Sequence, residues 1–74
     1  MKRSSVLSAF GLNVRKGREA RQLTQEALAE KSALHPTYVS GIERGVRNPS
    51  LLIVARIAKG LGTTISELSR GVER

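Results

Sequence analysis

The chain has 74 residues, enough for one domain spanning 1–74 and for no second one. It contains no cysteine, one histidine and six acidic residues, all of them glutamate. This composition excludes a disulfide framework and a thiolate zinc site, and it leaves almost no material for a catalytic triad, a carboxylate pair or a metal cage. We therefore expect no enzyme, no cofactor and no metal site.

The charge is strongly positive, with 13 basic residues against 6 acidic ones and a net charge of +7. Most of the positive surplus lies in residues 1–24. This segment contains six basic residues, Lys2 and Arg3 among them, and one acidic residue, Glu19. A surplus of this size on a small domain favours a polyanionic partner, with nucleic acid as the first candidate. The alternative is a charged helix face that only keeps the chain in solution.

No run of residues approaches the ~18 uninterrupted apolar positions that a membrane span requires. The basic start of the chain also lacks the long apolar run of a signal peptide. We therefore expect a cytoplasmic protein with no membrane partner.

The elements are expected to be helices, because apolar residues recur every three or four positions and nowhere alternate as in a strand. The first helix is predicted over about 6–21. Thr24 is a good N-cap for a second helix over about 25–31. Pro36 suits the first position of a third helix, which is predicted to stop at Gly45 as a left-handed C-terminal cap. The short turn between the second and third helices makes 24–44 a helix-turn-helix unit.

The rest of the chain is predicted to form two further helices. Ser50 caps a fourth helix that ends at Gly62 and is too apolar to be freely exposed. Thr64, with Glu67 three residues later, forms a capping box that opens a short fifth helix over about 65–69. The predicted fold class is all-α, with five helices in one compact domain.

Three linked motifs carry a family resemblance: LTQEALA at 23–29, YVSGIERG at 38–45 and NPS at 48–50. Over about 10–68 the chain resembles the Cro and repressor type of helix-turn-helix regulators, the xenobiotic-response-element family. The string at 37–44, followed by Arg47 and Asn48, is especially similar to the controller proteins of restriction–modification systems. The resemblance implies a lambda-repressor-like fold, a homodimer, and double-stranded DNA as the partner with the third helix in the major groove.

The resemblance places the N-terminus of the second helix at the DNA backbone. Gln25 lies there, where free N–H groups favour a phosphate, and its amide can reach a phosphate or brace the third helix. Ala33 stands where the family commonly has glycine, and it is expected either to carry about 1 kcal/mol of strain or to impose a slightly different turn. His35 lies in the turn, where it can cap a helix or contact a phosphate; as a lone histidine it is not expected to bind a metal.

Four residues of the third helix are predicted to face the groove, on the side away from the buried positions: Pro36, Thr37, Ser40 and Gly41. Thr37 and Ser40 can hydrogen-bond base edges. Family members often place glutamine, arginine or lysine at the position of Pro36. Specificity is therefore expected to depend more on Arg47, on Tyr38 and on DNA shape.

The residues around the end of the third helix complete the predicted DNA surface. Tyr38 either meets the DNA or forms a half-buried ring at the edge of the helix-turn-helix. Arg44, Arg47 and Asn48 lie where the family approaches the phosphate backbone; Arg44 is also favoured simply by the helix C-terminus. Arg47 could instead reach a base or enter the minor groove.

The resemblance assigns a structural role to Arg18 and Glu43, whose matching positions form a partly buried ion pair joining the first helix to the third. Removing one partner of such a pair leaves an unpaired buried charge. We expect neither residue to bind DNA.

A dimer is expected because two modules on a palindrome double the contacts of one small module. Apolar residues near the chain end are the predicted interface, with ordinary core packing as the alternative: Leu61, Ile65, Leu68 and Val72. Since the chain has no ligand domain, no small-molecule effector is expected.

The predicted function is sequence-specific, homodimeric transcriptional regulation from a palindromic operator, near the regulator's own promoter. Two alternatives stay open. An antitoxin-like protein-interaction module that also binds DNA would purify with a second small protein. A non-specific DNA-coating protein would show a steep salt dependence and little sequence discrimination.

Overall fold

The computed structural model describes residues 5–73, and over that range it is all-helical. The helices are α1 (Ser5–Ala20), α2 (Gln25–Ser32), α3 (Pro36–Glu43), α4 (Leu51–Leu61) and α5 (Ile65–Leu68). Each lies within two residues of its predicted range, so the all-α fold and the helix-turn-helix at its centre are confirmed.

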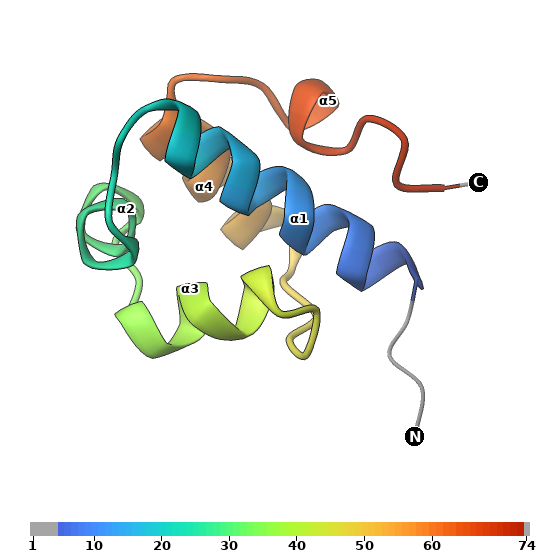
Figure 1. The fold of residues 1–74 in the computed structure, drawn as a ribbon, viewed down its shortest axis with the longest axis horizontal. Coiled ribbons are helices and arrows are strands. Elements are labelled where there is room, and N and C mark those ends of the chain that lie inside the picture. The colour runs from blue at the N-terminus through green and yellow to red at the C-terminus, as the bar shows by residue number, and fades with distance from the viewer. Residues whose placement is uncertain (1–4, 74) are drawn as a thin grey trace.

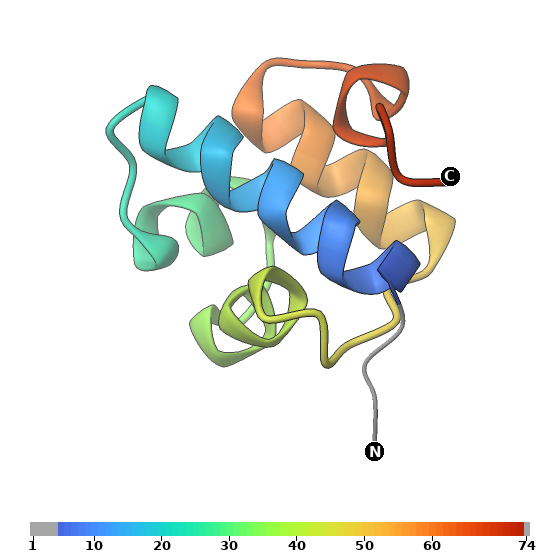
Figure 2. The ribbon, with the colours of Figure 1, turned by 45° about the vertical axis from the view of Figure 1, so that its right-hand side comes forward.

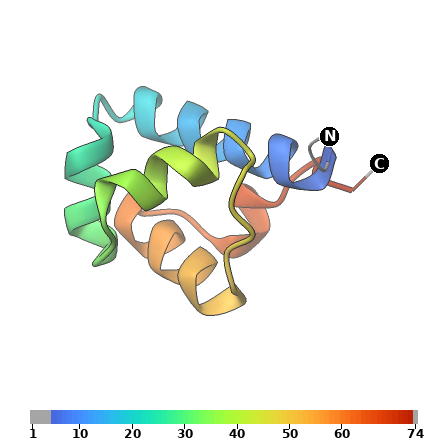
Figure 3. The same ribbon diagram turned by 90° about the horizontal axis from the view of Figure 1, so that it is seen from below.

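Helix α1 crosses the middle of the molecule and contacts α3, α4 and α5 (Figure 1). The helix-turn-helix pair, α2 and α3, lies on one side of α1, with α4 behind it and α5 on the opposite side (Figure 2). Seen from below, α3 lies across the near face of the molecule, and the loop after it leads back to the start of α4 (Figure 3). This arrangement leaves one long side of α3 without a covering element.

The predicted helix starts are confirmed by side-chain caps. The hydroxyl oxygens of Thr24, Ser50 and Thr64 accept hydrogen bonds from the backbone N–H three residues later, at 3.0, 3.2 and 3.1 Å. These caps satisfy donors that the first turn of a helix leaves free. In the predicted capping box the Thr64 half is present, whereas the Glu67 carboxylate pairs with Arg70 at 2.9 Å.

The turn between α2 and α3 has the geometry expected for a helix-turn-helix, built without glycine. Ala33 takes a left-handed conformation (φ 56°, ψ 45°), and its N–H donates to the Glu30 carbonyl at 3.2 Å. His35 is the N-cap of α3, because its Nδ1 accepts from the Thr37 N–H at 3.1 Å. Gln22, between α1 and α2, is also left-handed, with φ 57°. Helical periodicity did not predict the left-handed conformation of Gln22.

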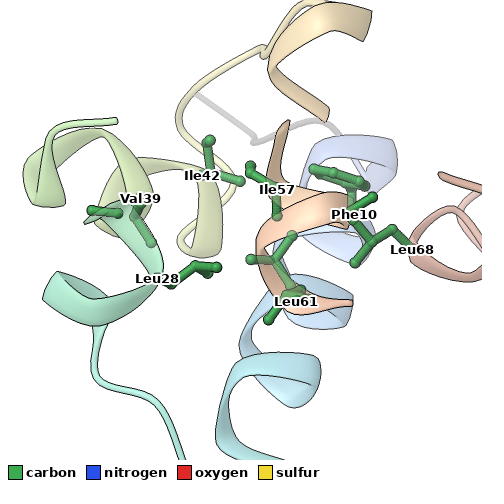
Figure 4. Packing of buried hydrophobic residues seen from close by; sticks show 10 residues of the cluster. Phe10, Leu28, Val39, Ile42, Ile57, Leu61 and Leu68 are labelled. Carbon is green, nitrogen blue, oxygen red and sulfur yellow. The ribbon is translucent and has the colours of Figure 1, made fainter. Parts of the chain in front are cut away.

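The core is a single cluster to which every helix contributes (Figure 4). Its members are Phe10, Val14, Leu28, Ala29, Val39, Ile42, Ile57, Ala58, Leu61 and Leu68. Over residues 5–73 no helix is both long and apolar enough to cross a membrane.

Helix α1 approaches the end of α3 at backbone distance. A β-carbon on Gly11 would collide with the carbonyl oxygen of Ile42 and would lie 2.7 Å from that of Glu43. Only glycine permits this approach. The helix α3 ends at Glu43, two residues before Gly45, which has the predicted left-handed conformation (φ 76°).

Candidate nucleic-acid interface

The uncovered side of α3 presents small polar side chains. Val39 and Ile42 point into the core, as predicted, while Thr37 is exposed and Pro36 and Ser40 are half-buried. This surface has the size and the hydrogen-bonding groups to meet base edges in a major groove. Contact of these residues with DNA stays a prediction.

Arg47 lies across the same helix. Its guanidinium carbon is 5.6 Å from the centre of the Tyr38 ring, within the range of a cation–π interaction. Tyr38 is half-buried and packs against the core, so its ring is a fixed support for the arginine. The ring is half-buried, as in one of the two alternatives for Tyr38, and contact of Tyr38 with DNA stays a prediction. That placement still leaves the Arg47 side chain at the edge of the groove-facing surface.

Gly41 is covered by the Arg47 side chain, so whether it faces the groove in a DNA complex stays a prediction. It is buried, and a β-carbon on it would lie 2.6 Å from Cγ of Arg47. Helical periodicity placed Gly41 on the outer side of α3, but it could not show that a residue six positions later would cover it. The Arg47 side chain therefore packs directly against Gly41, where a larger residue would displace it.

The inner end of α3 is held by a nearly buried charge cluster. Arg18 donates to both oxygens of the Glu43 carboxylate, at 2.7 and 3.1 Å, and also to the Leu23 carbonyl at 2.8 Å. The two side chains are only 13% and 4% exposed. The predicted structural ion pair is thus confirmed. Its hydrogen bond to Glu43 raises the pKa of Arg18, against the opposing effect of burial.

Gln25 takes part in this cluster. Its Nε2 donates to Oε1 of Glu43 at 3.1 Å, so the amide braces the third helix, the second of the two predicted alternatives. The cluster joins α1, α2 and α3 at the point where α3 ends. Gln25 still lies in the first turn of α2, where backbone N–H groups favour a phosphate.

Some basic side chains bind groups of the protein itself, whereas others are exposed and are not paired with a carboxylate within residues 5–73. Arg15 pairs with Glu19 at 3.2 Å, and Arg21 donates to the carbonyls of Gly17 and Leu61. Most of the described cations near the start of the chain are therefore tied to the protein itself. The predicted basic residues Lys2 and Arg3 lie outside the described residues.

Arg44, Arg47 and Asn48 form the open part of the predicted surface. All three are exposed, and within residues 5–73 neither arginine has a carboxylate partner. They follow α3 on the loop that borders its uncovered side (Figure 3). Their positive charge is therefore available to DNA phosphates. Over the same range, no group of three His, Cys, Asp or Glu side chains could hold a metal ion.

Of the four predicted dimer residues, the structure buries two in the core and leaves two at the surface. Leu61 and Leu68 are 4% and 3% exposed and belong to the core, so their assignment to an interface is wrong. Both positions satisfy the core alternative because α5 folds back over α1 and α4. Ile65, at 36% exposure, and Val72, which is half-buried, remain at the surface.

Larger exposed apolar side chains were missed by the sequence prediction. Leu51 and Leu52, in the first turn of α4, are 70% and 64% exposed, and Val6 on α1 is also exposed. The unusually apolar composition of the fourth helix was the one feature of the sequence that could have indicated these exposed apolar residues. Val6, Leu51, Ile65 and Val72 line one shallow hollow of about 230 Å³ between α1, α4 and α5.

Comparison with known proteins agrees with this geometry. A helix-turn-helix family model matches residues 14–68. The chain belongs to this helix-turn-helix family, whose members of the Cro/C1 type are DNA-binding transcriptional regulators. The predicted family is thereby confirmed.

The chain is also similar to individual controller proteins. It is 44% identical over 66 residues to Control protein C.MunI of Mycoplasma sp, covering 88% of this chain and 89% of that protein. It is 45% identical over 66 residues to Control protein C.BamHI of Bacillus amyloliquefaciens, covering 88% and 82%. The crystal structure of the restriction-modification controller protein C.AhdI from Aeromonas hydrophila matches with a TM-score of 0.83 at 44% identity, over 84% of this chain and 94% of that one.

Proposed function

We propose that the chain is a restriction–modification controller: a homodimeric transcriptional regulator that reads a palindromic operator near its own promoter. The observation that carries this proposal is the likeness to control proteins, which extends over 88% of the chain at 44% identity. The likeness includes the helices on both sides of the helix-turn-helix, so it goes beyond the DNA-binding motif alone.

On this proposal, reading and docking use different parts of the surface. Thr37 and Ser40 meet base edges, and Arg47 reaches a base from its position over Tyr38. Pro36 and His35 bring the start of α3 to the groove. The phosphate backbone of the DNA is contacted by Arg44, by Asn48 and by the first turn of α2 at Gln25. Because the base-reading side chains are small, a larger share of the specificity falls on Arg47 and on DNA shape.

The apolar hollow between α1, α4 and α5 is the proposed dimer surface. It contains Ile65 and Val72, two of the predicted interface residues, and the much more exposed Leu51. A contiguous exposed apolar surface is typical of an interaction site. The first turn of α4 follows the loop that carries Arg47 and Asn48. A second copy seated here would therefore fix the spacing between two DNA surfaces.

A selection from random duplex DNA tests the DNA part of the proposal, at about 150 mM salt so that purely electrostatic binding is weakened. We expect an enriched palindrome with one half-site spacing. Binding without an enriched motif would support a DNA-coating protein instead. The absence of bound DNA would shift the assignment to a protein-interaction module such as an antitoxin.

Sedimentation of two matched variants tests the dimer part. Leu51→Glu places a charge in the hollow, and we expect monomers. Leu52→Glu places the same charge on the neighbouring exposed residue, which does not line the hollow, and we expect the dimer to remain. If both variants stay dimeric, the second copy binds elsewhere. A charged residue at Leu68 would not be informative, because it would disrupt the core.

A further inference from the structure

A second surface of the molecule is basic and lies away from the uncovered side of α3. Helices α2 and α4 pack against each other. The end of α2 and the second half of α4 line an open depression of about 380 Å³. It is lined by Lys31, Ser32, Ala33, Arg56, Lys59 and Gly60. Three of these six residues are cations, and none is acidic. None of them is among the predicted DNA-binding residues.

The three cations are not neutralised by the protein. Within residues 5–73, Lys31, Arg56 and Lys59 have no carboxylate partner, whereas Arg15, Arg18 and Arg70 each have one. Three unpaired positive charges around one depression produce a local positive potential that favours an anion. Arginine and lysine at such a site supply charge-assisted hydrogen bonds to phosphate oxygens.

The floor of the depression carries an unused polar group. Ser32 is only 2% exposed, and among the described residues its hydroxyl has no hydrogen-bond partner. Gly60 makes room for it, because a β-carbon there would lie 2.6 Å from Ser32 Oγ. A buried hydroxyl without a partner is unfavourable. A bound phosphate, directly or through one water, would supply the missing acceptor.

Helix-end electrostatics do not account for the whole arrangement. Cations are favoured near helix C-termini, which explains Lys31 and Lys59 at the ends of α2 and α4. Arg56 lies in the middle of α4, and the helix dipole gives no reason for it. The backbone N–H groups of the caps bind the carbonyls of Ala29 and Glu30 in α2 and those of Ala58 and Lys59 in α4.

We propose that this depression binds the phosphate group of a small phosphorylated ligand. Arg56 and Lys59 on α4 and Lys31 on α2 hold the phosphate oxygens, and the Ser32 hydroxyl completes the site. The proposal concerns binding at a surface separate from the operator surface and does not rest on the proposed function. Such a ligand would be an exception to the expectation, made from the sequence, that no small molecule acts on the chain.

The probe is sodium tripolyphosphate, titrated at about 150 mM salt into the full chain while backbone amide resonances are followed by NMR. We expect saturable shifts confined to the end of α2 and the second half of α4. In the double variant Arg56→Gln/Lys59→Gln the affinity should fall by about tenfold or more, as expected for the loss of charge-assisted hydrogen bonds. Lys16→Gln is the charge control: Lys16 is exposed, has no carboxylate partner within residues 5–73 and lies outside the depression, so its effect should be under about twofold.

Shifts that do not saturate, that spread over all basic residues, or that persist in the double variant would overturn the proposal. A second measurement identifies the source of the phosphate. The double variant is compared with the unmodified chain in binding a random DNA duplex at several salt concentrations. If the depression takes a free phosphorylated ligand, the salt dependence is unchanged. If DNA supplies the phosphates, its slope falls by about 0.9 for each cation lost, and the small-ligand assignment is overturned.

Discussion

The two sides of helix α3 are held and used in different ways. On the inner side, the Glu43 carboxylate accepts three hydrogen bonds from Arg18 and Gln25, and its side chain is 4% exposed. On the outer side, Thr37 and Arg47 are exposed, and the Arg47 side chain lies over Tyr38 and Gly41. The buried contacts determine where the helix lies, whereas the exposed side chains determine what it can read. Substitutions among the exposed side chains can therefore leave the position of α3 unchanged. Substitutions in the buried contacts move α3 and so change the exposed surface as well.

The largest expected effect is on the inner side. Arg18→Ala leaves the Glu43 carboxylate buried without its cation, and we expect a loss of about 3–5 kcal/mol in the free energy of unfolding. Urea unfolding measures this. Arg15→Ala is the matched control, since the Arg15–Glu19 pair is more than half exposed, and it should cost less than about 1 kcal/mol. Equal losses for the two variants would contradict the assigned difference between the buried and exposed pairs.

The next effect concerns the approach of α1 to α3. In Gly11→Ala the new methyl group meets backbone oxygens, which cannot move aside as a side chain can. We expect a loss of about 1–3 kcal/mol, with a shift in Tm of about 4–8 °C for each kcal/mol in a domain of this size. In Gly17→Ala, in the same helix, the methyl group meets only side-chain atoms, Leu61 Cδ1 at 3.3 Å and Arg21 Nη1 at 3.6 Å, and the change should be close to neutral. Similar melting shifts for both would mean that α1 can move away from α3 at little cost.

On the outer side, Arg47→Ala should change binding and leave stability alone, because the side chain is exposed. We expect specific affinity for the selected operator to fall by about 1–3 kcal/mol if Arg47 reaches a base. The test is the dissociation constant for the operator beside that for a scrambled duplex. An equal loss on both sequences would reassign Arg47 to the phosphate backbone.

The smallest effect is at Gly41. A methyl group there pushes Arg47 away from its place over Tyr38, but the arginine stays in the chain. We expect Gly41→Ala to weaken operator binding by about 0.5–1.5 kcal/mol, the scale of ordering one long side chain. Tyr38 is the only tyrosine and there is no tryptophan, so its fluorescence reports the displacement directly.

A double-mutant cycle sharpens this prediction. Once Arg47 has been replaced by alanine, Gly41→Ala should have no further effect on operator binding, because its only assigned action is on the Arg47 side chain. Additive losses would show that Gly41 contacts DNA by itself, as its position in the helical pattern first indicated.

Local signals in the sequence were sufficient for the elements and for much of the family assignment. Thr24, Ser50 and Thr64 cap the helices that they were predicted to cap, since capping depends on residues three positions apart. The Arg18–Glu43 pair came from the resemblance, because nothing local joins residues 25 positions apart. The errors at Leu61 and Leu68, and the cover over Gly41 that was not foreseen, all concern which surface another part of the chain covers.

The sequence alone was enough to establish the class of the protein: five helices, three of them with recognisable N-caps, a helix-turn-helix at their centre, a basic surplus and the motifs of a known regulator family. Periodicity and capping are properties of a few neighbouring residues, so they can be read without the fold. The tertiary packing is what places Arg47 over Gly41 and buries Leu68 of α5 in the core. It also brings three cations that have no carboxylate partner within residues 5–73 around the Ser32 hydroxyl. Those facts depend on how distant segments pack, and exposure is set by that packing.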